Sequence, residues 1–150
     1  MQRSRTTTAA APPTPGPAVV RAIRGATRAH ADEPALIEAA TGELLSTIMD
    51  RNAVGDDDLI SILFTVTPDL ASAYPARAAR ELGLTEVPLM CATEIPVPGA
   101  LTRVIRVLAH VHTSRPRESL RHVYLGGAAV LRPDLAAVEA VPTGPLLRGE

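Results

Sequence analysis

The chain has little aromatic character, one cysteine and no lysine. One Phe, two Tyr and no Trp occur among 150 residues. The platforms on which nucleic-acid bases stack are therefore missing, which argues against single-strand nucleic-acid binding. The single cysteine, Cys91, excludes a disulfide within the chain and a multi-cysteine zinc site. A formal net charge of -1 predicts no bulk electrostatic attraction to nucleic acid or to a membrane surface.

Long apolar runs are absent as well. No stretch reaches the roughly 18 apolar residues that a membrane-spanning helix needs, so we expect no membrane insertion. The N-terminal stretch TTTAAAPPTPGPA is too polar and proline-rich for a secretory signal, so we expect a cytoplasmic protein. Because residues 1–17 are low-complexity Thr, Ala and Pro, we expect them to be disordered. We expect one domain over residues 18–135 and a flexible tail over 136–150.

Hydrophobic periodicity predicts one long helix, one short helix and about five strands. The long helix begins at Asp32-Glu33-Pro34, with Asp32 as the cap and an acidic first turn, and runs to about Ala53, with Gly55 as the stop. The short helix covers 75–82 and is closed by Gly83. Strands are predicted over 19–26, 59–67, 87–94 and 101–112, and a hairpin-like pair of short strands over 121–131, hinged on Gly126-Gly127.

The run LISILFTVT at 59–67 is apolar almost throughout, so we expect it in mid-sheet and covered on both faces. This mixture of elements predicts an α+β fold, a mixed sheet with helices on one face. So few helices cannot cover both faces of the sheet, so one apolar face remains uncovered. Covering that face with other subunits predicts a homo-oligomer.

Three arginines lie in or at the end of apolar, strand-like runs: Arg24, Arg106 and Arg132. Arginine keeps its charge in proteins and offers five donors in a rigid fork, so holding it against apolar walls is costly without an anionic partner. Glu94, at the end of a predicted strand, adds an acceptor among these donors. The pattern predicts a pocket for a small dicarboxylate. No nucleophile–base motif and no phosphate-binding glycine loop accompanies it.

Seven stretches together resemble the monofunctional chorismate mutases of the AroH class. They are IRGAT (23–27), TPDL (67–70), YPARAAREL (74–82), VPLMCATEIPV (87–97), VIRVL (104–108), RHVYL (121–125) and VLRPDL (130–135). The resemblance implies a homotrimer shaped as a pseudo α/β barrel, with active sites in the clefts between subunits. It implies conversion of chorismate to prephenate, the first committed step toward phenylalanine and tyrosine, without a cofactor.

The resemblance also implies a role for each matching residue. Arg24 would grip a substrate carboxylate, Arg106 would reach the ether oxygen and a carboxylate, and Glu94 would accept a hydrogen bond from the ring hydroxyl. Tyr124 would bond the side-chain carboxylate. The remaining implied pocket residues are Cys91 beside Glu94, Tyr74, Ala76 and Arg77 from the neighbouring subunit, Leu89 and Met90 on the floor, and Leu131 and Arg132 over the mouth.

Two residues depart from the family pattern. Tyr74 stands where Phe is frequent and adds a hydroxyl at the pocket edge, and Met90 stands where a smaller Thr is common. Neither removes a charge that the reaction needs. His110 and His112 lie two apart on one predicted strand, but no third ligand is visible nearby, so we expect no metal site.

Two alternatives stay open at this point. One is an imine deaminase of the Rid type, on a similar trimeric scaffold, whose chemistry would not require Glu94, Tyr124 and Arg106 together. The other is a trimer that binds the ligand without turning it over, since a small displacement of Arg106 would silence the reaction.

Overall fold

The computed structural model describes residues 16–136 and contains one mixed five-stranded sheet with helices, an α+β fold. The strands are β1 (Val19–Arg28), β2 (Leu59–Val66), β3 (Leu89–Thr93), β4 (Val104–Thr113) and β5 (Val123–Tyr124). The helices are α1 (Pro34–Asn52), α2 (Ala76–Glu81) and α3 (Pro133–Ala136), with short 3-10 turns η1 (Asp56–Asp58), η2 (Arg117–Ser119) and η3 (Ala128–Leu131). The ends of the chain for which disorder and a flexible tail were predicted lie outside the described residues, apart from 16–17 and 136.

The strand order is β3-β2-β4-β1-β5, so β4 lies at the centre of the sheet. It pairs antiparallel with β1 over ten residues, from Val104 opposite Arg28 to Thr113 opposite Val19, and antiparallel with β2 on its other side. The two edge strands are parallel to their neighbours, β3 to β2 and β5 to β1. The predicted interior position of the 59–67 strand is confirmed, because β2 has a hydrogen-bonded neighbour on each side.

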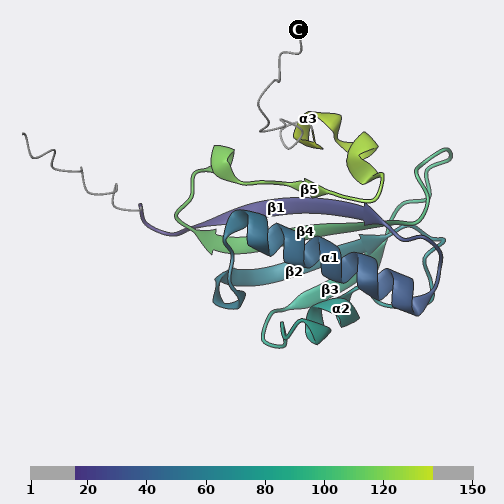
Figure 1. Cartoon of the computed structure of the whole chain (residues 1–150), viewed down its shortest axis with the longest axis horizontal. Coiled ribbons are helices and arrows are strands. Elements are labelled where there is room, and N and C mark those ends of the chain that lie inside the picture. The colour runs from purple at the N-terminus through teal and green to yellow at the C-terminus, as the bar shows by residue number, and fades with distance from the viewer. Residues whose placement is uncertain (1–15, 137–150) are drawn as a thin grey trace, which may run out of the picture.

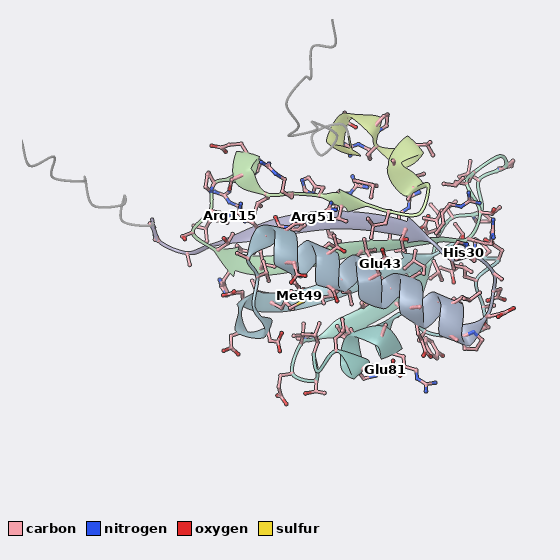
Figure 2. All side chains as sticks on the ribbon, viewed as in Figure 1. His30, Glu43, Met49, Arg51, Glu81 and Arg115 are labelled. Carbon is pink, nitrogen blue, oxygen red and sulfur yellow. The ribbon has the colours of Figure 1, made fainter. Side chains whose placement is uncertain are left out.

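The core lies between one face of the sheet and the two longer helices. Helix α1 runs along the sheet and α2 lies beside it near β3 (Figure 1). Alternate strand residues point to this face, and Ile23, Phe64 and Val107 pack there against Leu44 and Ile48 of α1. Figure 2 labels Glu43 and Met49 on α1 and Glu81 on α2, and shows how closely side chains fill the layer. Burying each large apolar side chain in this layer contributes roughly 1.5–3 kcal/mol.

The opposite face of the sheet carries Arg24, Leu63, Met90 and Arg106, and is called the open face below. Leu63 is 38% exposed and Met90 63% exposed, whereas their neighbours along the same strands, Phe64 and Cys91, face the core layer. The prediction that the 59–67 strand is covered on both faces is therefore wrong for the chain by itself. The reason is that α1 and α2 both pack on one side of the sheet.

The predicted ends of the long helix need correction. Glu33, not Asp32, is the residue before the first turn, and the first turn holds no acidic side chain. The Asp32 carboxylate instead accepts the backbone N–H groups of Ala71 and Ser72, both at 3.0 Å, and hydrogen bonds from Ser72 and Ala71 hold its pKa below the usual value. The helix ends before Gly55, because Ala53 adopts a left-handed conformation with φ 52°.

The predicted hairpin over 121–131 is also wrong. Only Val123 and Tyr124 form a strand, and they pair in parallel with β1. Gly126 and Gly127 follow with φ of 58° and 85°, a conformation that side chains disfavour, and the chain then enters η3. These two glycines lead the chain into a 3-10 turn and not into a returning strand, so within the described residues the outer edge of β5 has no hairpin partner.

Candidate active site

The sheet register places several predicted site residues in one row. Ala26 of β1 is opposite Arg106 of β4 on one side and Tyr124 of β5 on the other. Thr65 of β2 is opposite Arg106. Residues directly opposite in a sheet point to the same face, so these side chains share the open face. Arg24, two residues before Ala26 on β1, points to the same face in the next row.

This row surrounds a cavity of about 430 Å³. Its lining includes Arg24, Arg106 and Tyr124, with apolar contributions from Leu63 and Leu108. The space exists because Ala26, whose side chain is only a methyl group, lies between the much larger side chains of Arg106 and Tyr124. A volume of this size suits a small organic molecule. No carboxylate appears in this lining, so in the described part of the chain the cavity wall is cationic.

Glu94 lies beside Arg106 at the rim. One of its carboxylate oxygens, Oε2, is 3.1 Å from Nε of Arg106 and accepts a 2.7 Å hydrogen bond from Thr65 Oγ1. The backbone N–H of Glu94 donates to the carbonyl of Val66 at 2.8 Å and extends the pairing of β3 with β2 beyond Thr93. The contact between Arg106 Nε and the carboxylate is an ion pair and not a hydrogen bond, so this N–H has no hydrogen-bond acceptor among the described residues.

Tyr124 supplies a second unsatisfied group. Its hydroxyl is buried and has no hydrogen-bond partner among the described residues. Leaving a buried polar group without a partner costs about 1–3 kcal/mol, so an unpaired donor here indicates that a ligand group completes the site. Two such donors, on Arg106 and Tyr124, meet at one cavity.

The backbone of Arg24 is held by a residue that sequence reasoning missed. Its N–H donates to Nδ1 of His122 at 2.9 Å. Burial lowers the pKa of His122, and the nearby charges of Arg24 and Arg132 lower it further. The only sequence signal for His122 is its position in the stretch RHVYL, two residues before Tyr124.

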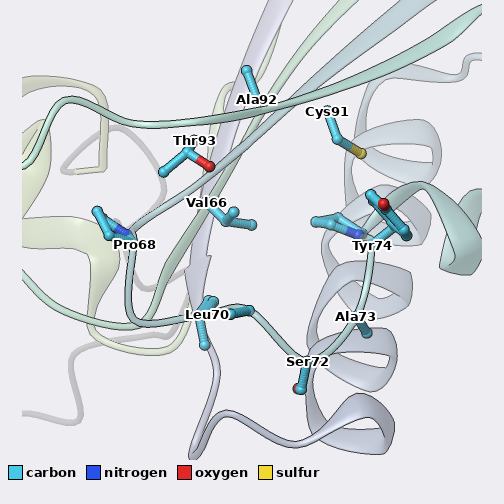
Figure 3. Close-up of a pocket in the computed structure, with 11 residues that line it drawn as sticks. Val66, Pro68, Leu70, Ser72, Ala73, Tyr74, Cys91, Ala92 and Thr93 are labelled. Carbon is cyan, nitrogen blue, oxygen red and sulfur yellow. The ribbon is translucent and has the colours of Figure 1, made fainter.

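A second pocket, of about 380 Å³, lies at the β3 edge of the sheet. Figure 3 shows Tyr74 and Cys91 at one end of it and Pro68 at the other. The hydrogen bonds from the N–H groups of Ala71 and Ser72 to Asp32 hold the loop that forms its wall. Tyr74 is 75% exposed, so this pocket presents an aromatic ring to whatever covers it.

The other predicted site residues are spread around these two pockets. Leu89 packs against the core on the helix side, Ala76 is buried in α2, and Met90 lies on the open face. Arg77 pairs with Glu38 at 3.3 Å and with Glu81 at 3.5 Å.

At the C-terminal end, Leu131 closes η3, and Arg132 follows it. Arg132 forms a 2.9 Å ion pair with Asp134, whose hydrogen bonds raise the pKa of the Arg132 guanidinium. The structure thus brings Arg24, Arg106, Glu94 and Tyr124 together and places Tyr74 and Cys91 in the second pocket.

Across residues 16–136, no three His, Cys, Asp or Glu side chains cluster in a way that could hold a metal ion. Within the same residues, no helix has the length and apolar character needed to cross a membrane.

Comparisons with known proteins agree with one another. The family model for chorismate mutase type I matches residues 20–135. The chain is 49% identical over 122 residues to a chorismate mutase AroH from Thermus thermophilus, covering 81% of this chain and 100% of that protein. It is 42% identical over 119 residues to a chorismate mutase AroH from Bacillus subtilis strain 168, covering 79% and 94%.

A solved structure of a chorismate mutase from Clostridium thermocellum superimposes with a TM-score of 0.73 at 48% identity, over 73% of this chain and 98% of that one. The family model alone spans more than three quarters of the sequence, residues 20–135 of 150. The chain therefore belongs to the chorismate mutase type I family.

Proposed function

We propose that this chain is a chorismate mutase that rearranges chorismate to prephenate in the Arg24–Arg106–Tyr124 cavity, completed by a neighbouring subunit. The observation that carries the proposal is the pair of unsatisfied donors, on Arg106 and Tyr124, at one cationic cavity on the open face. We propose residues 18–135 as the catalytic domain and the cytoplasm as its location. Family membership removes the imine deaminase alternative.

The chemistry explains why no nucleophile or general base is needed. Chorismate rearranges by a [3,3] shift in which the ether C–O bond breaks as a C–C bond forms. No proton moves and no covalent intermediate forms on the enzyme. Two terms remain for the protein to supply: holding the flexible dianion in its compact diaxial form, and stabilising the negative charge that grows on the ether oxygen.

Each site residue has a role in this scheme. Arg106 reaches the ether oxygen with its guanidinium, whose Nε–H makes no hydrogen bond within the described residues. Arg24 and Tyr124 bind carboxylates that are present throughout the reaction, so they contribute to affinity and orientation. Glu94 accepts a hydrogen bond from the ring hydroxyl. Only the Arg106 interaction strengthens as the bond breaks, which is the kind of binding that accelerates a reaction.

A homotrimer in the form of a pseudo α/β barrel would complete this site. Tyr74 is 75% exposed and Met90 63% exposed in the single chain. The family resemblance assigns Tyr74 to the segment that closes the pocket of the neighbouring subunit, and Met90 to the pocket floor. In this arrangement the second pocket of one subunit, with Tyr74 and Cys91, closes over the arginine cavity of the next. Leu131 and Arg132 would cover the mouth.

Replacement of Arg106 tests the mechanism. Arg106→Ala should reduce kcat by roughly 10²–10³-fold, since loss of one transition-state donor costs about 2.7–4 kcal/mol. Arg106→Lys should remain impaired, because a flexible point charge does not reproduce the planar fork. The measurement is the decay of chorismate ultraviolet absorbance with the purified protein, followed by detection of prephenate.

Arg24→Ala is the matched comparison, and it should raise KM more than it lowers kcat. An Arg106→Ala protein with unchanged kcat would show that the assigned role is wrong. A correctly assembled wild-type protein that forms no prephenate would instead favour a non-catalytic binding trimer.

A further inference from the structure

His122 occupies an unusual place in the sheet. Strand β5 contains only two residues, and it pairs with β1 at Gly25 and Ala26. One position earlier, the N–H of Arg24 points toward the β5 side and meets an imidazole nitrogen, Nδ1 of His122, at 2.9 Å instead of a backbone carbonyl. A side chain therefore continues the ladder at the position of a predicted substrate-binding arginine, Arg24.

The imidazole also lines a third pocket, which is distinct from the two described above. This pocket has a volume of about 380 Å³ and lies next to the arginine cavity, with Val20, Ala22 and Leu120 as its apolar members. No carboxylate appears in this lining in the described part of the chain. The charged and titratable groups around His122 are Arg21, His110 and Arg117, which line the same pocket, and Arg24 and Arg132, whose charges act on the imidazole.

Only the neutral imidazole can make this contact. A neutral ring has one acceptor nitrogen and one N–H, and the Arg24 N–H requires Nδ1 to be the acceptor, so Nε2 carries the hydrogen. Burial, followed by the charges of Arg24 and Arg132, lowers the pKa of His122 and favours this neutral form. Stability that depends on neutral His122 is present above the ordinary histidine pKa of about 6.5 and is lost as pH falls below it.

We propose that His122 is a positioning residue for Arg24: its neutral imidazole fixes the backbone at Arg24, and protonation releases that backbone and lowers substrate affinity. A protonated ring donates from both nitrogens, so the acceptor is lost and a new positive charge appears beside Arg24. This inference rests on the proposed function of Arg24 as a carboxylate anchor. It adds an acid-sensitive element to a reaction that itself transfers no proton.

Two variants separate the hydrogen bond from the bulk of the ring. His122→Ala removes the acceptor, and we expect its KM for chorismate to rise about five-fold, the effect of one lost hydrogen bond, with kcat little changed. His122→Asn keeps an acceptor oxygen close to the position of Nδ1 and cannot be protonated, so it should retain a KM near the wild-type value. Steady-state kinetics between pH 5 and 8 would then show KM rising in acid for the wild type but not for His122→Asn.

Nuclear magnetic resonance of the 15N-labelled imidazoles gives a readout that does not depend on activity. The expected result is an unprotonated Nδ1 on His122 at neutral pH and a titration below that of an exposed histidine. A protonated Nδ1, an ordinary titration, or a wild-type acid dependence that persists in His122→Asn would overturn the proposal. If His122→Ala does not fold, the last two measurements still decide the matter.

The two proposals fail in different ways. Absence of mutase activity in wild-type protein would refute the proposed function and with it the role of His122. An active wild type with an unchanged His122→Ala would refute the positioning role alone.

Discussion

Asn52 shows how a single side chain connects the long helix to the strand that carries Tyr124. It is buried at the last position of α1, where its amide nitrogen donates to the carbonyls of Ile48 and Arg121, both at 2.8 Å. Its carbonyl oxygen accepts the N–H of Arg121 at 2.7 Å. These contacts satisfy both backbone groups of Arg121, directly before His122. The side-chain amide of asparagine can both donate to and accept from the backbone of one residue in this way.

Asn52→Ala should therefore destabilise the protein. It leaves the partly buried backbone groups of Arg121 without their side-chain partners, at up to about 1–3 kcal/mol for each group that stays unsatisfied. Chemical denaturation monitored by circular dichroism measures the change. Asp50→Ala, at an exposed position in the same helical turn, is the control and should have little effect. An Asn52→Ala protein as stable as this control would show that the contacts contribute little.

At the residue scale, the family motifs predicted which residues form the site, but they did not predict what each of these residues contacts. Arg24, Arg106, Glu94 and Tyr124 were predicted and lie together. The role of His122 was not predictable, because a histidine acting as a neutral acceptor leaves no pattern in the sequence. The assignment of the four predicted residues to one cavity depended on the sheet register, which a single sequence does not contain.

Element positions were predictable and element ends were not. The runs at 59–67 and 101–112 were correctly read as strands, because their apolar and β-branched residues indicate a half-buried or buried sheet. Asp32 has the right chemistry for a helix cap, but its carboxylate is engaged by the loop at Ala71. The hairpin over 121–131 failed because a Gly-Gly pair is compatible with several turns, and only tertiary contacts select one.

The fit between α1 and β1 can be tested with two glycines. A Cβ at Gly25 would lie 2.7 Å from Cδ1 of Ile48 and 3.2 Å from the carbonyl oxygen of Val123, so Gly25→Ala should cost about 1–3 kcal/mol as the helix is displaced. Gly42 lies inside α1 with nothing within 4 Å of such a Cβ. Gly42→Ala should stabilise the protein by about 0.5–1 kcal/mol. Thermal unfolding measures the stability of both variants. Equal effects of the two substitutions would contradict the proposed close packing at Gly25.

At the scale of the whole molecule, the two longer helices leave half of the sheet surface without cover from the described chain. Figure 1 shows α1 and α2 on the same side of the sheet. The sequence predicted this imbalance, because it contained too few helical segments for a sheet of five strands. What the sequence could not supply is which strand residues face which side, and hence that Leu63 and Met90 would be exposed.

Leu63→Asp tests whether another subunit covers the open face. A carboxylate in the middle of an apolar contact would be desolvated without a partner, so we expect the proposed trimer to dissociate and mutase activity to fall with it. Light scattering coupled to size-exclusion chromatography measures the mass. Glu43→Lys, at an exposed position on α1, changes charge away from this face and should leave assembly intact. A Leu63→Asp protein that stays trimeric would locate the interface elsewhere.

The pairing of β1 with β4 has a consequence for how the chain reaches its native state. Val19, near the start, must find Thr113, near the end, before the ten-residue ladder can close. Proteins dominated by such sequence-distant pairings fold slowly, because the entropy of closing a long loop is lost before the contacts form. During synthesis, β1 must wait for its partner β4 until most of the domain has been translated.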